Sequence, residues 1–100
     1  MDFEKVLNSV QYRKPLVQCI TNFVTVNDCA NIILASGGRP TMASHSLEAE
    51  EAVRNAHALV CNMGAIEHVD SMLLAGKEAN RIGKPVILDP VGAVGTQLRR

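Results

Sequence analysis

The fold of this chain is decided by the stretch Pro85-Val86-Ile87-Leu88-Asp89-Pro90-Val91-Gly92. Its apolar half is typical of a parallel strand that is buried on both faces, and Asp89 stands where that strand ends. In an open α/β sheet, ligands bind at the carboxyl ends of the strands, where a carboxylate can hold a metal ion or order a phosphate. The alternative is that Asp89 only caps the turn before Pro90.

Three further apolar stretches precede this one, and helical patterns separate them. Strands are predicted at residues 16–20, 40–43, 58–62 and 85–88. Strands that alternate with helices indicate βαβ units and one parallel sheet. The predicted fold class is therefore α/β, a parallel sheet flanked by helices, in one continuous unit without a linker.

The helical patterns each have an apolar face and recognisable ends. Helices are predicted at about residues 3–11, 25–36, 47–56 and 68–82. Thr25 with Asp28 resembles a capping box, and Ser46 is the expected cap of the third helix. The first two helices are expected to bury Phe3, Val6, Leu7 and Val10, and Val26, Cys29, Ala30, Ile33 and Leu34.

The composition excludes several classes of protein. Ten basic residues balance ten acidic residues among 100, so no net field attracts nucleic acid or an anionic membrane, and the basic pair Arg99-Arg100 is too short to matter. No apolar run reaches the length of a transmembrane helix, and the first residues lack the layout of a signal peptide. We expect a soluble cytoplasmic protein that acts on a small molecule.

The chain has three cysteines, Cys19, Cys29 and Cys61, all among apolar neighbours. They are widely spaced and form no Cys-x-x-Cys pair. This pattern predicts reduced, buried thiols rather than a metal site, a redox centre or a nucleophile.

Polar residues collect where the predicted strands end. The first strand is followed by Thr21 and Asn22, the second ends near Met42, the third ends in Asn62, and the fourth ends in Asp89. Because parallel strands end at the same edge of a sheet, these groups and nearby glycines are expected to form a small-molecule pocket. No phosphate-binding loop of a standard pattern is present.

Each of these residues also has a purely structural interpretation. Asn22 and Asn62 can serve only as Asx turns, and Met42 can be core filler. The three histidines, His45, His57 and His68, are scattered and are interpreted as surface or capping residues. Composition and spacing alone therefore predict an α/β domain with a ligand-binding edge.

Five motifs in order resemble a known family. They are Pro15-Leu16-Val17-Gln18-Cys19-Ile20-Thr21-Asn22, Ala30-Asn31, Pro40-Thr41-Met42-Ala43, Ala58-Leu59-Val60-Cys61-Asn62-Met63-Gly64 and Leu88-Asp89-Pro90-Val91-Gly92. Together, over about residues 15 to 100, they look like hydroxyethylthiazole kinase of the ribokinase-like superfamily. By this resemblance, residues 1–100 are the N-terminal part of a single ribokinase-like α/β domain.

The resemblance implies an activity and roles for particular residues. The family phosphorylates the hydroxyl of 4-methyl-5-(2-hydroxyethyl)thiazole with ATP and Mg²⁺, to supply thiamine synthesis. Its members resemble one another in forming homotrimers with substrate sites between subunits. Asn22, Val24 and Met42 would line the thiazole pocket. Asp89 would lie near the phosphates and help to hold Mg²⁺, directly or through water.

The chain resembles only the first part of a family member. The family's ATP-binding residues, anion hole and catalytic cysteine lie beyond that part, so no catalytic residue is assigned here and the 100 residues alone are expected to be inactive. Two departures are local. Ala65 stands where the family usually has threonine, and the segment 92–96 differs from the usual Gly-x-Gly-Ala-Thr.

Two other interpretations remain open. A truncated gene product could be a non-catalytic small-molecule-binding or interaction module, in which an exposed sheet edge favours association. An unrelated flavodoxin-like domain would bind a different ligand, such as a flavin.

Overall fold

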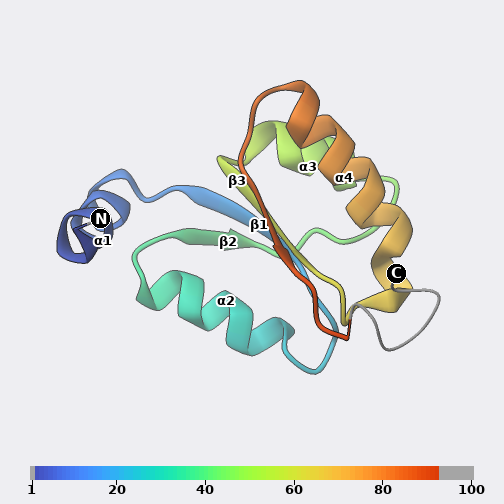
Figure 1. Cartoon of the computed structure of the whole chain (residues 1–100), viewed down its shortest axis with the longest axis horizontal. Helices are drawn as coiled ribbons and strands as arrows, with labels where there is room; N and C mark the ends of the chain where they lie inside the picture. The colour runs from blue at the N-terminus through green and yellow to red at the C-terminus, as the bar shows by residue number, and fades with distance from the viewer. Residues whose placement is uncertain (1, 93–100) are drawn as a thin grey trace.

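A computed structural model describes residues 2–92 of the chain. Four parallel strands form one sheet, and helices lie on both of its faces (Figure 1). The predicted α/β class is confirmed. In chain order the elements are α1 (Phe3–Arg13), β1 (Leu16–Ile20), α2 (Val26–Ala35), β2 (Arg39–Thr41), α3 (Ala49–Asn55), β3 (Ala58–Asn62), a 3₁₀ turn (Ile66–His68), α4 (Val69–Arg81) and β4 (Val86–Asp89).

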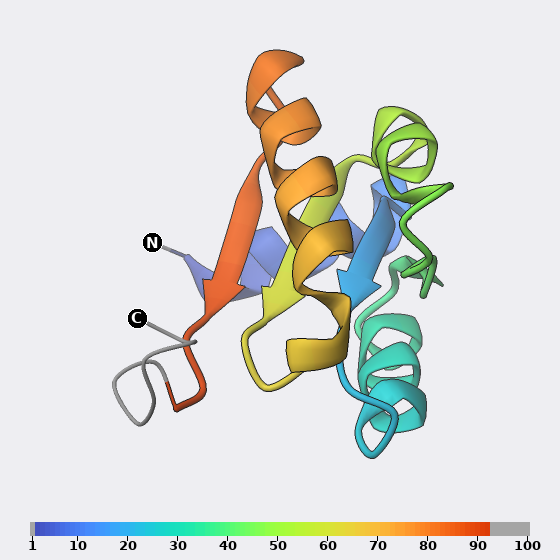
Figure 2. The same cartoon turned by 90° about the vertical axis from the view of Figure 1, so that its right-hand side faces the viewer.

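The sheet has the strand order β2-β1-β3-β4. Strand β2 is added on one side of β1, and β3 and β4 follow on the other side. Helix α2 lies on one face, while α3 and α4 lie together on the other (Figure 1). Figure 2 shows α4 running across the strands β3 and β4. The register sets Asn62 beside Asp89, which fixes the last residues of β3 and β4 next to each other.

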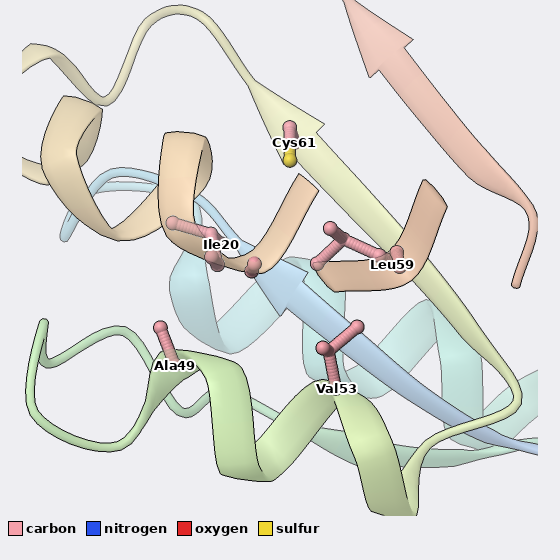
Figure 3. Packing of buried hydrophobic residues seen from close by; sticks show 7 residues of the cluster. Ile20, Ala49, Val53, Leu59 and Cys61 are labelled. Atoms are coloured by element: carbon pink, nitrogen blue, oxygen red, sulfur yellow. The ribbon is translucent and has the colours of Figure 1, made fainter. Parts of the chain in front are cut away.

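The hydrophobic core fills the space between the sheet and the α3–α4 layer. Its fully buried side chains come from β1, β3 and both helices, with Met72 and Val86 packed against them. Alternation along the strands turns Leu59 and Cys61 to this face, and the paired register sets Ile20 beside Cys61. Figure 3 shows these side chains meeting; the buried set is Ile20, Ala49, Val53, Leu59, Cys61, Ala75 and Ala79.

The opposite face of the sheet is thinly covered. Within residues 2–92, no side chain of α1 or α2 is fully buried, and Phe3 and Leu34 are 74% and 56% exposed. The prediction that both helices bury an apolar face is therefore confirmed only in part. Six of the predicted residues are half-buried and three are exposed: the first group is Leu7, Val10, Val26, Cys29, Ala30 and Ile33, and the second is Phe3, Val6 and Leu34. Helical periodicity reports which side of a helix is apolar, but burial also needs a partner, and few residues lie opposite these two helices.

The boundaries agree with prediction best for the central strands. Strands β1 and β3 have the predicted residues, whereas β2 and β4 are shifted by one residue or shortened. The prediction that the fourth strand is buried on both faces is wrong for residues 2–92, because β4 lies at the edge of the sheet, with Ile87 60% and Leu88 58% exposed. The predicted capping box of Thr25 and Asp28 does not form, because the Thr25 hydroxyl bonds to Thr21 and Asn22 instead. Ser46 caps no helix: residues 46–48 form a turn, and α3 begins at Ala49.

An ion-pair network joins α3 to α4 at the rim of the core. Glu78 is only 6% exposed, and its carboxylate accepts hydrogen bonds from Arg81 and Arg54. Arg54 also pairs with Glu50 at 3.3 Å. The two guanidinium groups, Arg81 first, lower the pKa of Glu78 from 4.5 to about 2.

We expect Glu78→Gln to destabilise the fold in a pH-dependent manner. Because the pKa of Glu78 is lower in the folded state, its contribution is full above the unfolded pKa of 4.5 and is lost as the pH falls towards about 2. The difference in free energy of unfolding between wild type and variant, measured by urea denaturation, should therefore shrink from pH 5 to pH 2 by this linkage. A difference that stays constant over this range would contradict the assignment. Glu51→Gln, at an exposed position of α3, is the matched control.

Candidate functional site

The polar residues predicted at the strand ends do lie along one edge of the sheet. Figure 2 shows β1, β3 and β4 ending on the same side. Asn22 follows β1 by two residues, and Asn62 and Asp89 are the last residues of their strands. On the far side of β1, Met42 directly follows β2, whose Thr41 is paired with Gln18. We call this the carboxyl edge.

Asn22 folds the loop between β1 and α2 back on itself. Its Oδ1 accepts hydrogen bonds from the backbone N–H groups of Val24 and Thr25 and from the Thr25 hydroxyl, each at 3.0 Å. The Asx-turn interpretation of Asn22 is therefore correct for its oxygen. Its Nδ2 lies on the other side of the amide, where it approaches Gly64: the distance to the position of a Cβ built on that glycine is 3.3 Å.

Asn62 ties the loop after β3 to the end of β1. Its Oδ1 accepts a hydrogen bond from Gly64 N–H at 2.7 Å, and its Nδ2 donates to the Thr21 hydroxyl at 3.1 Å. Thr21 is 4% exposed, so this connection is shielded from water. The two asparagines thus hold two loops that are separated by 41 residues in sequence.

The two apolar site candidates differ in their exposure. Val24 is 72% exposed on the β1–α2 loop, and Met42 is half-buried after β2. Gln18 anchors the segment that carries Met42. It is fully buried, and its Nε2 donates a hydrogen bond to the carbonyl of Ala43 at 2.9 Å. Gln18 also bonds to the carbonyl of Ala49 at 3.4 Å, so it fixes the whole connection between β2 and α3.

Asp89 presents its carboxylate to solvent. Its backbone carbonyl, not its side chain, accepts the N–H groups of Met63 and Val91, both at 2.9 Å. Among residues 2–92, its side chain makes no hydrogen bond or ion pair. Within residues 2–92 the turn after β4 therefore does not use the carboxylate, which is exposed. The segment 92–96, which differs from the family's usual sequence, lies outside the described residues except for Gly92. The pair Arg99-Arg100 lies outside them as well.

The chemistry of Asp89 fits magnesium. No group of three or more metal-ligating side chains occurs in the described part of the chain. Magnesium does not need such a group, because it binds through one or two carboxylates and keeps several of its waters. A single exposed carboxylate at the carboxyl edge satisfies that requirement.

A cavity of about 300 Å³ opens where the β2–α3 loop meets the start of α4. His45 and His57 are exposed, and each accepts a backbone N–H through Nδ1, from Leu47 and Leu16 respectively. The interpretation of these two histidines as surface residues is therefore confirmed, but neither caps a helix, because their partners lie in a turn and at the start of β1. The cavity is lined by Ser44, His45, Ser46, Glu67, His68, Asp70 and Ser71.

The cysteines behave as buried thiols rather than reactive groups. Burial, followed by the neighbouring Cys29, raises the pKa of Cys19 from 9.0 to about 12, and burial raises the pKa of Cys61 to about 11. Both are protonated at neutral pH, which makes them poor nucleophiles. Cys29 is only half-buried.

Thr21 was predicted at this edge, but Thr25 was not, and neither was the contact between the two. Thr21 and Thr25 link the two asparagines through their hydroxyl groups, which lie 2.8 Å apart. Their spacing of four residues across a strand end and a loop gave no helical or strand pattern from which this contact could be predicted.

No helix in residues 2–92 is long and apolar enough to cross a membrane.

Comparison with known proteins identifies the family. Residues 7–100 match the Hydroxyethylthiazole kinase family. Hydroxyethylthiazole kinase of Desulfovibrio desulfuricans is 52% identical over 99 residues, covering 97% of this chain and 35% of that protein. The protein of the same name from Thermoanaerobacter pseudethanolicus is 55% identical over 98 residues, covering 96% and 37%.

A solved structure agrees with the sequence comparison. The hydroxyethylthiazole kinase protein from Pyrococcus horikoshii OT3 superposes with a TM-score of 0.85 at 45% identity, covering 95% of this chain and 38% of that chain. The present chain thus spans little more than a third of the length of the relatives that it matches. Because the family match covers residues 7–100, which is nearly the whole chain, the chain belongs to the Hydroxyethylthiazole kinase family.

Proposed function

We propose that this chain supplies the thiazole-binding half of an ATP-dependent kinase. The kinase phosphorylates the hydroxyl of 4-methyl-5-(2-hydroxyethyl)thiazole in thiamine biosynthesis or salvage. The observation that carries the proposal is the set of amide and carboxylate groups on the carboxyl edge, in a chain 52–55% identical to hydroxyethylthiazole kinases. In this proposal, residues 1–100 are the N-terminal part of a single ribokinase-like α/β domain.

The site residues have distinct roles in this proposal. Asn22 binds the thiazole through its amide, and Val24 and Met42 contact its apolar parts. The exposure of Val24 and the half-buried position of Met42 leave both side chains available for such contacts. Fixing the alcohol in one orientation is a large part of catalysis, because phosphoryl transfer depends on positioning and charge stabilisation.

Asp89 is the residue that would hold magnesium, directly or through a water molecule. When bound, the metal ion supplies positive charge that stabilises the phosphate oxygens during transfer. Asp89 itself contributes a carboxylate that is exposed and that has no side-chain partner among residues 2–92. No catalytic residue is proposed within these 100 residues, and the ATP-binding groups belong to the remainder of the domain.

The proposal is tested by assaying the complete gene product that carries this sequence. We expect it to transfer phosphate from ATP to the thiazole alcohol in the presence of Mg²⁺, whereas residues 1–100 alone should give no thiazole phosphate. Absence of product from the complete protein would overturn the proposed activity. Turnover by residues 1–100 alone would overturn the assignment of the nucleotide site to the rest of the domain.

The assembly is part of the same proposal. A cytoplasmic homotrimer, with each thiazole site between two subunits, would explain why apolar side chains such as Phe23, 83% exposed beside Asn22 and Val24, lie open on this chain. Analytical ultracentrifugation of the complete gene product should give three times the mass of one subunit. A stable monomer with full activity would exclude this arrangement.

We expect Gly64→Ala to weaken binding of the thiazole. A Cβ at this position would lie 2.9 Å from Asn62 Oδ1 and 3.3 Å from Asn22 Nδ2, so the loop or the amides must shift. A displacement of this kind at a positioning group should raise the KM for the thiazole about tenfold. Gly76→Ala in α4 is the control, because nothing lies within 4 Å of its added methyl group. Equal KM values for the two variants would show that the space beside Gly64 is irrelevant to binding.

A further inference from the structure

Four side chains at the carboxyl edge form one continuous chain of hydrogen bonds. It runs from Asn62 Nδ2 to Thr21 Oγ1 at 3.1 Å, from Thr21 Oγ1 to Thr25 Oγ1 at 2.8 Å, and from Thr25 Oγ1 to Asn22 Oδ1 at 3.0 Å. We call these four residues the amide–threonine relay. It connects the loop after β3 with the loop after β1.

Backbone N–H groups at both ends of the relay fix the orientation of the two side-chain amides, that is, the positions of Oδ1 and Nδ2. Gly64 N–H donates to Asn62 at 2.7 Å, so the atom that receives it must be the carbonyl oxygen. Val24 N–H donates to Asn22 in the same way at 3.0 Å. A flipped amide would set N–H against N–H at either place, which is unfavourable.

With both amides fixed, every hydroxyl proton in the relay has one position. Thr25 donates its only hydroxyl proton to Asn22 Oδ1, so it can only accept from Thr21. Thr21 in turn accepts from Asn62 Nδ2 and donates to Thr25. All protons therefore run in one direction, from Asn62 towards Asn22.

The relay leaves one polar group of Asn22 for a ligand. Oδ1 is occupied by three donors from the loop, so the side that faces Gly64 and the carboxyl edge is the Nδ2 amide. This group has two N–H donors and no acceptor. A ligand bound against Asn22 must therefore present a hydrogen-bond acceptor.

We propose that Thr21, Thr25 and Asn62 are positioning residues that hold the Asn22 amide with its N–H groups towards the substrate. Asn22 then donates a hydrogen bond to an acceptor atom of the thiazole alcohol, either its ring nitrogen or its hydroxyl oxygen. This inference rests on the proposed function, since it takes the thiazole alcohol as the ligand of this edge. Because Thr21 is 4% exposed, water cannot easily replace the central link of the relay.

The relay is tested by removing one hydroxyl and restoring it. In the complete gene product, Thr25→Val keeps the size of the side chain but cannot donate to Asn22, whereas Thr25→Ser keeps the hydroxyl. We expect Thr25→Val to raise the KM for the thiazole about tenfold with kcat within about twofold, and Thr25→Ser to stay near wild type. Ser36→Ala is the control, because it removes a hydroxyl that bonds to Ile32 carbonyl at 2.8 Å at the other end of α2.

The donor role of Asn22 is tested by Asn22→Asp. The carboxylate can still accept from Val24, Thr25 and the Thr25 hydroxyl, but its second oxygen faces the substrate as an acceptor. We expect calorimetry without ATP to show thiazole binding weakened at least tenfold, with an unchanged unfolding midpoint. Binding equal to that of wild type would overturn the donor role.

A double-variant comparison separates failure of the relay from failure of the proposed function. Because each single variant already loses the bond between Thr21 and Thr25, the double variant Thr21→Val with Thr25→Val should lower the urea midpoint by less than the sum of the two single losses. Additive losses would overturn the relay whatever the substrate is. Absence of thiazole binding by the wild type would instead overturn the proposed function, and with it the positioning role. Equal KM increases for Thr25→Val and Thr25→Ser would overturn the role of the hydroxyl.

Discussion

Asp89→Asn is expected to lower the turnover rate of the complete gene product by about 100- to 1,000-fold at the Mg²⁺ concentration that just saturates the wild type, with a much smaller effect on the KM for the thiazole. The substitution keeps the size of the side chain and removes one negative charge. Its carboxylate is exposed at the end of β4, and among residues 2–92 no partner neutralises it. The loss should therefore come from weaker binding of the metal ion rather than from a disturbed fold.

A magnesium titration distinguishes this explanation from a structural one. The variant should need a much higher Mg²⁺ concentration for half-maximal activity, while its unfolding midpoint stays at the wild-type value. Asp2→Asn is a matched control, because Asp2 caps α1 through a hydrogen bond to Lys5 N–H at 3.2 Å and asparagine can accept the same bond. An Asp89→Asn enzyme with wild-type kcat and magnesium dependence would exclude a metal-binding role.

The layout of this edge was predictable, because parallel strands must end together. The apolar stretches before Asn22, Asn62 and Asp89 each define a strand, and the βαβ alternation makes the strands parallel. The positions of these three residues therefore follow from local pattern alone. Their roles in binding stay predictions, since geometry gives their positions and not their ligand.

The orientation of the amides was not predictable in the same way. It depends on Gly64 N–H and on the hydroxyl of Thr21, which meets Asn62 across 41 residues of sequence. The expected capping box at Thr25 does not form for a local reason: the Thr25 hydroxyl bonds to Thr21 and Asn22, four and three residues earlier in the chain. Threonine side chains have several local partners to choose from, and the residue pattern does not tell which one is used.

The apolar surfaces of α1 and α2 show a different limit of sequence analysis. Their periodicity was read correctly, yet within residues 2–92 the side chains of both helices stay at least partly exposed. Curated relatives are nearly three times as long as this chain, so more protein is available there to cover such faces. Periodicity indicates that a face is to be covered, but not which part of a protein covers it.

Leu59→Ala is expected to be the most destabilising core substitution, lowering the free energy of unfolding by about 2–5 kcal/mol. Leu59 lies on β3, is fully buried, and is among the largest side chains between the sheet and the α3–α4 layer (Figure 3). Its neighbours Ala75 and Ala79 are small and sit on a rigid helix, so they cannot collapse into the space that the lost atoms leave.

The effect of Leu59→Ala on function should follow from stability alone. Strand β3 ends in Asn62, three residues after Leu59, and the Asn62 side chain is held by its own hydrogen bonds to Thr21 and Gly64. Below the unfolding transition the KM for the thiazole should stay close to wild type, because the backbone pairing of β3 with β1 and β4 persists. Leu73→Ala, at a position of α4 that is 55% exposed, provides the matched control and should cost less than about 1 kcal/mol. Urea denaturation of the two variants decides the matter: if Leu73→Ala costs as much as Leu59→Ala, the stability of this chain does not reside in the α3–α4 core.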